Sequence, residues 1–457
     1  MSLRFASFVA TSTLALTAAC GPNPRGGGDD GTDQIDAAGG GDPDATPQVV
    51  GVLRGRVWAP NMGLGQAPPG QEIPVFGATV YLTGIRPDPI PAGVYCEECV
   101  QAPPGGVVSS HDGSFEVAAP PGTYWLVIQK GQFRLEQEYT IDVGTVDLGP
   151  AATTLPSEHD PAGGKFMPKI ALVRGGSDNV QDIMGKIGIG TMVGNSFSSA
   201  NGEMDMYEYS ATPGTMGTAE QLLRNPAMMA QYHIIFFPCA TSMSSIDTVL
   251  RDQNVLRNVR QYVHDGGKLY VTDWSGEVVD RSFPQQITHG DTGTDSTGTY
   301  DPVALTGTLA TVGDADGGSY TSPDAEAVDT DLSQWLGLQS GPTPSNPTGA
   351  TMFNPAAFDV QGNWNWISTL TDVPIGVDPM TSLTVYDTPK PWVIGSKPSN
   401  PVGKKPLAVT YEPTGCGRVL YSTYQTSNSA HAGLFPQERI LLYLIMELGQ
   451  CSATVIE

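Results

Sequence analysis

The sequence predicts a multidomain chain in which a β-sandwich is followed by an α/β domain whose mostly parallel sheet carries a long insertion. Two observations carry this prediction. Between residues 49 and 150, short segments alternate apolar with polar residues and are separated by Gly, Pro and Asp. From residue 169 onward, apolar strands alternate with segments of helical periodicity, the order expected of right-handed βαβ units.

The first twenty residues predict an export signal. One positive charge, Arg4, precedes the apolar and hydroxyl-rich run of residues 8 to 18, which fits a secretory signal and is too short for a permanent membrane span. The run ends in Thr17-Ala18-Ala19-Cys20, which resembles the lipobox of bacterial lipoproteins except that Leu16 stands one position early. This resemblance implies cleavage before Cys20 and a lipid on its thiol, so that residues 1 to 20 are a lipoprotein signal peptide. A plain signal peptide with a chance cysteine is the alternative.

Residues 21 to 48 predict a tether. They are rich in Gly, Pro and Asp and contain almost no apolar residue, so they cannot bury enough surface to offset the entropy of ordering them. We expect a disordered acidic tether that holds the folded domains away from a membrane. The net charge of −24, from 47 acidic and 23 basic residues, disfavours nucleic acid as a partner.

The first structured domain is expected over residues 49 to 150. Its strands are predicted at 53–59, 78–84, 113–119, 122–130 and 138–143. The segments GRV at 55–57, IPVFGATV at 73–80, DGSF at 112–115 and PGTY at 121–124 resemble the carboxypeptidase regulatory-like domain. The resemblance implies a prealbumin-like β-sandwich that is an accessory module without a catalytic site.

A CxxC motif lies in a long loop of this domain, at Cys96 and Cys99. Such a pair forms a redox centre, half a zinc site or a disulfide. Two glutamates separate the cysteines, prolines surround them, and no second ligand pair has zinc spacing. In an oxidising compartment we therefore expect a loop disulfide and neither a metal nor a cofactor.

The second domain is expected over residues 169 to 451, after a linker at 151–168 and before a short tail at 452–457. Strands are predicted at 169–176, 204–210, 232–238 and 268–274, and helices at 179–187, 218–229 and 254–265. Residues 287 to about 380 give weak signals and are interpreted as a loop-rich insertion. A strand–turn–strand segment at 406–426 and an apolar helix at 436–451 close the domain.

The segments 232–238, 256–271 and 415–421 resemble the class I glutamine amidotransferase-like fold, which is flavodoxin-like, and within it the ThuA-like group. In working members a nucleophilic cysteine occupies the middle of a G-x-C-x-G turn. The corresponding residues here are 272–276, in which Trp274 takes the nucleophile position and Thr272 replaces the first glycine. The later His-x-Glu pair is missing, because Ala432 and Gly433 follow His431. The resemblance therefore implies a domain without its catalytic group.

Cys239 follows the apolar strand at 232–238 and looks at first like a nucleophile. No histidine can be placed beside it from the sequence, and it comes one strand earlier than the family's cysteine. We interpret it as a buried free thiol. The remaining pair, Cys416 and Cys451, is expected to form a disulfide that ties the last helix to the sheet.

Three weaker candidate sites remain. Asp273, Ser275 and Glu277 lie at the end of a parallel strand, where open α/β sheets bind ligands, although such residues more often form turns and caps. Trp364 and Trp366 alternate as on one strand face and are either core residues or a stacking surface for a sugar. Several loop aspartates could bind calcium, but their spacing fits no EF-hand, so solvated carboxylates are favoured: Asp291, Asp295, Asp301, Asp314 and Asp316.

Together these features predict a cell-envelope lipoprotein, most simply of the outer membrane. The sequence does not decide whether the protein faces the periplasm or the cell surface. Its amidotransferase-like domain is expected to act in binding or structural display rather than catalysis. Its partners would be the membrane, through Cys20, and an envelope glycan or protein. The alternative is an extracytoplasmic hydrolase, acting on carbohydrate, with its site at residues 273–277.

Overall fold

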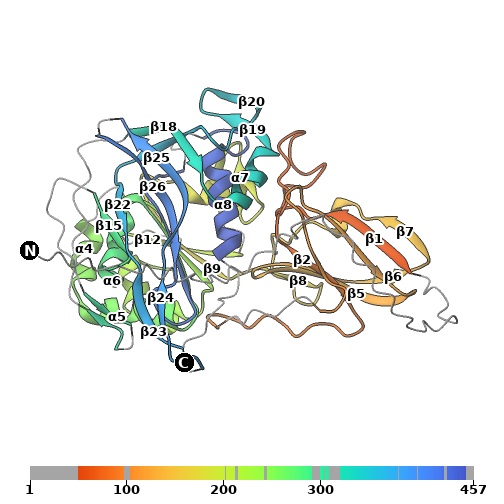
Figure 1. The fold of residues 1–457 in the computed structure, drawn as a ribbon, viewed down its shortest axis with the longest axis horizontal. Helices are drawn as coiled ribbons and strands as arrows, with labels where there is room; N and C mark the ends of the chain where they lie inside the picture. Colours follow the sequence, from red (N-terminus) through yellow and green to blue (C-terminus); the bar gives the residue numbers. More distant parts are fainter. Residues whose placement is uncertain are drawn as a thin grey trace, which may run out of the picture.

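The computed structural model describes residues 50–96, 103–200, 202–210, 215–240, 244–290, 299–302, 304–307, 320–378, 380–398, 400–426 and 430–448. The signal and tether segments, with Cys20, lie outside the described residues. The architecture is β-rich and built from several sheets. A β-sandwich stands beside a larger body that contains a nine-stranded sheet and most of the helices (Figure 1).

The β-sandwich has two sheets, of order β4-β1-β7 and β3-β2-β5-β6-β8. The alternating pattern places Leu53, Val80, Leu126 and Ile128 at 0% exposure between them. The strand bounds are β1 Gly51–Arg56, β2 Thr79–Thr83, β3 Val107–Val108, β4 Ser114–Ala119, β5 Gly122–Lys130, β6 Phe133–Ile141, β7 Gly144–Asp147 and β8 Lys165–Phe166. The expected linker thus contributes β8 to the sandwich, together with the short helix η1 Pro150–Ala152.

The nine-stranded sheet has the order β12-β9-β13-β14-β27-β26-β25-β18-β21. Its first five strands pair in parallel, and the pairs from β27 to β21 are antiparallel. The bounds are β9 Ile170–Arg174, β12 Met204–Glu208, β13 Ile234–Phe237, β14 Lys268–Thr272, β18 Tyr320–Ala327, β21 Phe358–Asn363, β25 Lys390–Lys397, β26 Asn400–Tyr411 and β27 Arg418–Ser422.

Apolar side chains pack against both faces of this sheet. Ile234 and Phe236 belong to a core that includes α1, α7, α8 and the sandwich, whereas Ile235 and Phe237 belong to a second core with α2 to α6. Strands buried on both faces are continuously apolar, as these are. The helices are α1 Val180–Lys186, α2 Ala219–Leu223, α3 Pro226–Met229, α4 Ser244–Leu250, α5 Gln253–His264, α6 Glu277–Ser282, α7 Thr330–Gly337 and α8 Pro436–Leu448.

The segment expected to be a loop-rich insertion contains regular structure. It supplies β18, α7 and β21, and with them two strands of the nine-stranded sheet. Shorter pairs also lie in or beside it: β15 Ile287–His289 with β22 Ile367–Leu370, β16 Tyr300–Asp301 with β17 Thr306–Gly307, β19 Ser340–Thr343 with β20 Asn346–Met352, and β23 Val373–Val377 with β24 Thr384–Asp387. Irregular registers and many Gly and Thr residues weakened the alternation that predicts strands.

The sandwich and the larger body share one hydrophobic core, with α7 and α8 lying between them (Figure 1). The buried indole of Trp335 on α7 donates to Pro74 O of the sandwich at 2.7 Å. Lys130 on β5, 3% exposed, forms an ion pair with Glu447 on α8. A shared core of this kind fixes the two parts relative to one another.

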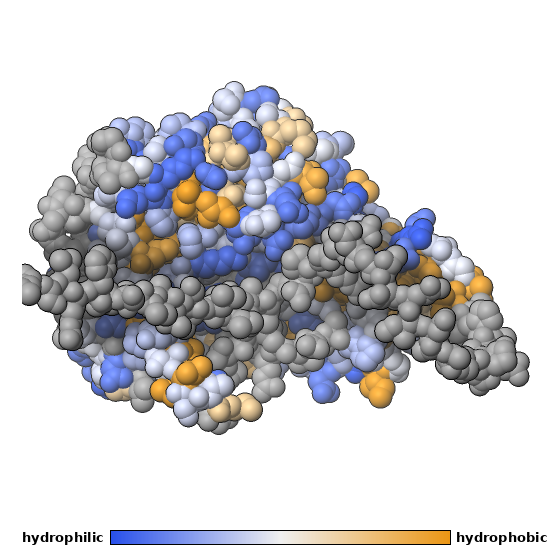
Figure 2. All heavy atoms as spheres, in the orientation of Figure 1, coloured by the Kyte–Doolittle hydropathy of each residue, from blue (hydrophilic) through white to orange (hydrophobic). Residues whose placement is uncertain are grey.

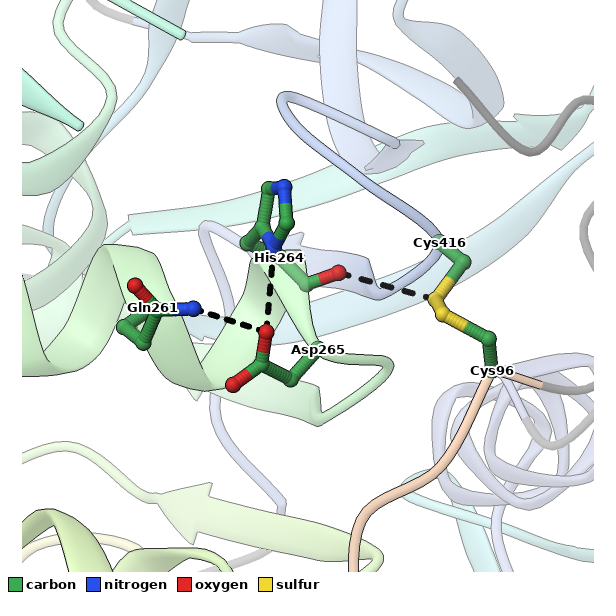
Figure 3. Close-up of a disulfide and its surroundings, with 5 residues drawn as sticks. All are labelled: Cys96, Gln261, His264, Asp265 and Cys416. Carbon is green, nitrogen blue, oxygen red and sulfur yellow. Dashed lines mark hydrogen bonds and ion pairs between the residues drawn. A yellow bond between two sulfur atoms is a disulfide. The ribbon is translucent and has the colours of Figure 1, made fainter. Parts of the chain in front are cut away.

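A disulfide also joins the two parts and corrects both pairings expected from the sequence. Cys96 is bonded to Cys416, with Cα atoms 5.5 Å apart, so neither a Cys96–Cys99 nor a Cys416–Cys451 bridge is present (Figure 3). The reason is tertiary, because both cysteines lie at the end of α5. Cys416 N donates to His264 O at 3.2 Å, and Tyr95 O, next to Cys96, packs against Gly266 just beyond the helix. Cys99 and Cys451 lie outside the described residues.

On the face shown in Figure 2, hydrophilic residues predominate and hydrophobic residues form separate small patches. None of the helices in the described ranges is long and apolar enough to cross a bilayer.

Candidate functional site

The candidate site lies where β14 ends. Thr272 is followed directly by the short helix η2 Asp273–Gly276 and then by α6. Asp273 has a φ of +46°, a left-handed conformation that is uncommon for residues other than glycine and that costs free energy. A strained strand-to-helix turn of this kind is how several enzyme folds expose a nucleophile. The left-handed residue here is Asp273, one position before Trp274, to which the sequence resemblance assigns the nucleophile position.

The side chain of Asp273 is buried and fully engaged. Its Oδ1 accepts the backbone N–H groups of Trp364 at 3.2 Å and Asn365 at 3.0 Å, and its Oδ2 accepts from Gln425 Nε2 at 3.0 Å. Burial raises the pKa of this carboxyl well above its ordinary value and outweighs these hydrogen bonds. With 0% exposure and each oxygen already bonded, Asp273 is closed to a substrate.

Cys239 lies next to Asp273 and is a buried free thiol. Its Sγ is 3.0 Å from Gln425 Nε2, and its N–H donates to Thr272 Oγ1 at 2.8 Å. Burial, and then the neighbouring Asp273, raise the pKa of the thiol far above its ordinary value. Since the thiolate is the nucleophilic form, this environment disfavours the reactive form of Cys239.

Ser275 is held in the same way. Its Oγ donates to Pro238 O at 2.7 Å and lies 2.8 Å from the hydroxyl of Tyr209. Burial raises the pKa of Tyr209, so its hydroxyl cannot act as a base near neutral pH. Glu277 points elsewhere and forms an ion pair with Arg281. The three candidates at 273–277 are therefore close in sequence but form no nucleophile–base pair.

A second buried carboxyl completes the network and was missed in the sequence. Asp178, which follows β9, accepts from Thr272 Oγ1 at 2.6 Å and from the N–H of Thr426 at 3.0 Å. Burial raises its pKa. Its place four residues after the end of β9, beyond Gly175, was the available signal. Gln425, which follows β27 and bridges Cys239 and Asp273, had none.

Trp274, Trp364 and Trp366 are partly exposed rather than core residues, and the first two lie beside Asp273. Trp274 and Trp364 have ring centroids 5.3 Å apart, and Lys397 Nζ lies 5.7 Å from the ring centroid of Trp366. Trp364 belongs to the segment between β21 and β22 that covers Asp273. The segment expected to be an insertion therefore packs over the end of β14 and shields Asp273.

A metal site was the remaining candidate, and the structure describes only part of it. Within the described ranges, no group of three or more His, Cys, Asp or Glu side chains is placed to hold an ion. Asp301 is on β16, and the other loop aspartates considered for calcium lie outside the described residues. His431, which is not part of a His-x-Glu motif, has its Nε2 atom 2.9 Å from Glu438 Oε2 on α8.

Comparison with known proteins identifies no family. The chain matches no protein-family model, and no curated protein is significantly similar to it. Among solved structures, a ThuA-like protein from Bacteroides uniformis is 10% identical, with 61% of this chain and 87% of that chain covered and a TM-score of 0.25. A protein of Salmonella typhimurium LT2 described as cytoplasmic is 8% identical, with 72% and 97% covered and a TM-score of 0.28. A second Salmonella typhimurium protein so described is 12% identical, with 53% and 80% covered and a TM-score of 0.23. Scores this low carry no argument about this chain.

Proposed function

We propose that this chain is a cell-envelope lipoprotein with a regulatory-like, prealbumin-like β-sandwich and a non-catalytic amidotransferase-like domain of the ThuA-like kind, acting in binding or structural display. One observation carries the proposal: the strand end where related folds place their nucleophile is sealed. Asp273, Ser275 and Cys239 are each at most 1% exposed.

The sealing is chemical as well as steric. A nucleophile needs a base within hydrogen-bond reach or a lowered pKa. Ser275 instead contacts a backbone carbonyl and a tyrosine hydroxyl, and the pKa values of Cys239 and Asp273 are raised. These features favour the non-catalytic function over the hydrolase alternative.

The envelope location rests on the sequence of the first 48 residues. A lipid on Cys20 and an acidic tether would place the folded part near, but not against, a membrane surface. Mass spectrometry of the mature N-terminus tests this: the proposal requires a chain that begins at Cys20 and carries the added mass of acyl groups. A chain that still carries residues 1–19, or an unmodified Cys20, contradicts it.

The closed site is tested by mapping thiol reactivity in the native chain. With iodoacetamide, we expect Cys239 to stay unlabelled in native protein for hours and to be labelled within minutes in urea, as read by peptide mass spectrometry. The Cys239→Ala variant is the matched control for peptide assignment. A serine-directed fluorophosphonate should likewise leave Ser275 unmodified.

A covalent adduct on native Cys239 or Ser275, formed at a rate comparable to that in the unfolded chain, would contradict the non-catalytic proposal and favour the hydrolase. The binding role is then addressed with an array of envelope glycans and peptidoglycan fragments. Retention of at least one of them by native but not unfolded protein is the expected result.

A further inference from the structure

A cavity of about 120 Å³ lies between the β-sandwich and the larger body, away from the strand-end site. The sandwich side contributes Met62, Pro68 and Gln71, and the other side contributes Lys186, Leu434 and Arg439. Because a water molecule occupies about 30 Å³ in the liquid, the cavity has room for several waters or for a small organic molecule. Cavities at domain interfaces are common ligand sites.

Among the described residues, the wall of this cavity contains a buried cation that forms no direct ion pair. Arg439 on α8 is 0% exposed. Its guanidinium donates only to neutral oxygens: Leu434 O, Glu72 O, Gln71 O and Gln339 Oε1. These account for four of the five N–H groups that a guanidinium carries, and the fifth is on Nη2. Within the described part of the chain, no carboxylate comes within 4.0 Å of it. Burial lowers its pKa to about 9, although the more distant carboxylates of Glu72 and Glu438 oppose this shift.

Lys186 adds a second positive charge. Its side chain is 9% exposed, and Nζ lies 4.0 Å from Glu438 Oε2 and 3.4 Å from His431 Nε2. Glu438 already accepts from His431 and from the N–H of Phe435, each at 2.9 Å. Lys186 thus shares this single carboxylate with two closer donors and is paired with it only at 4.0 Å. Buried charges are costly unless they are paired.

Gln71 supplies the complementary feature. Its Oε1 is buried and has no hydrogen-bond donor among the described residues. Gly433 packs against this oxygen. A Cβ atom on residue 433 would lie 2.2 Å from Gln71 Oε1, so a larger residue does not fit there. An acceptor left without a donor in a cavity indicates that a bound molecule or water satisfies it.

We propose that this cavity binds a small carboxylate that also carries a hydrogen-bond donor, such as an amino acid or a hydroxy acid. The carboxylate lies toward Lys186, with the charge of Arg439 behind it, and the ammonium or hydroxyl group donates to Gln71 Oε1. The proposal is independent of the proposed function, because it involves neither the strand-end site nor the membrane anchor.

The test is isothermal titration of the full chain with glycine, D- and L-alanine, glycolate, acetate and methyl glycolate. At least one of glycine, alanine and glycolate should bind with saturation. Acetate, which lacks the donor, should bind at least tenfold more weakly, and methyl glycolate, which lacks the charge, should not bind. These comparisons need only the unaltered protein. Binding of inorganic phosphate with no binding of any of these carboxylates would overturn the proposal.

Two variants locate the site. Lys186→Met should weaken glycolate or glycine binding at least tenfold, and Gln71→Leu should abolish the preference over acetate. Lys165→Met, which removes a partly exposed lysine of the sandwich, is the control and should leave binding unchanged. Absence of saturable binding by every carboxylate, or equal affinities in Lys186→Met and unaltered protein, would refute the assignment. Neither result would alter the expected protection of Cys239.

Discussion

Replacing Asp387 by Asn should change how the stability of the protein depends on pH. Asp387 is on β24, is 5% exposed, and accepts the N–H of Glu412 at 2.8 Å through Oδ1. Burial is the main cause that raises its pKa from 3.8 to about 7, and the nearby carboxylates of Glu412 and Asp372 add to the rise. Asparagine keeps an oxygen for the Glu412 N–H and removes the titration.

The sign and size of the effect follow from linkage. Between pH 4 and 7 the folded state holds a proton on Asp387 that the unfolded state releases, so this group makes the free energy of unfolding fall as pH rises. Each pKa unit corresponds to about 1.36 kcal/mol, so the total over this window is about 4 kcal/mol. The contribution is fully present only below the unfolded pKa of 3.8, is still mostly present at pH 4, and is lost by about pH 8. Relative to Asp387→Asn, the unaltered protein should therefore be about 4 kcal/mol less stable at pH 8 than at pH 4.

Urea unfolding followed by tryptophan fluorescence, at each pH unit from 4 to 8, measures this difference. Other buried carboxyls, such as Glu277, whose pKa is raised to about 7, are present in both proteins and cancel from the comparison. Asp147→Asn, at an exposed site on β7, is the control and should show no such trend. A difference between unaltered protein and Asp387→Asn that stays within about 1 kcal/mol from pH 4 to 8 would refute the reasoning.

Two further predictions concern the joint between the sandwich and the larger body. Replacing Cys96 and Cys416 together by Ser should lower the free energy of unfolding by about 2 to 5 kcal/mol, because the bond closes a long loop in the unfolded chain. Urea unfolding with and without reductant measures this difference. Equal urea midpoints for the variant and the unaltered protein would contradict the prediction. Trp335→Phe should cost about 1 to 3 kcal/mol, because it leaves Pro74 O without its donor and removes buried ring atoms; a thermal melt unchanged from that of the unaltered protein would count against this contact.

Much of the strand and helix order could be predicted because periodicity is a local property. The alternation in residues 113–119 and the apolar run at 232–238 each lie within one element, and the structure has β4 and β13 there. The helix predicted at 254–265 is α5, which starts after the capping residue Asp252. The strands within 287–380 were not predicted, because short strands with irregular register bury few alternating positions.

The disulfide and the site could not be predicted in the same way, because both depend on contacts far apart in the chain. Cys96 and Cys416 are 320 residues apart, and what brings them together is the packing of a loop against α5. The CxxC spacing suggested a bond between Cys96 and Cys99. Sequence spacing, however, does not show which cysteine lies near Cys96 in the folded chain. Asp273 receives its hydrogen bonds from residues 91, 92 and 152 positions away.

The strained turn at Asp273 has a structural explanation that needs no catalysis. A left-handed aspartate persists only where its surroundings hold it. Here its carboxyl receives the amides of Trp364 and Asn365, and its carbonyl accepts the hydroxyl of Tyr421 on β27 at 3.1 Å. These contacts connect β14, β27 and the segment between β21 and β22 at one point. The conformation that exposes a nucleophile in other folds therefore joins two strands of the sheet to the segment between β21 and β22 in this protein. The same hydrogen bonds that stabilise the turn occupy both carboxyl oxygens and the carbonyl of Asp273.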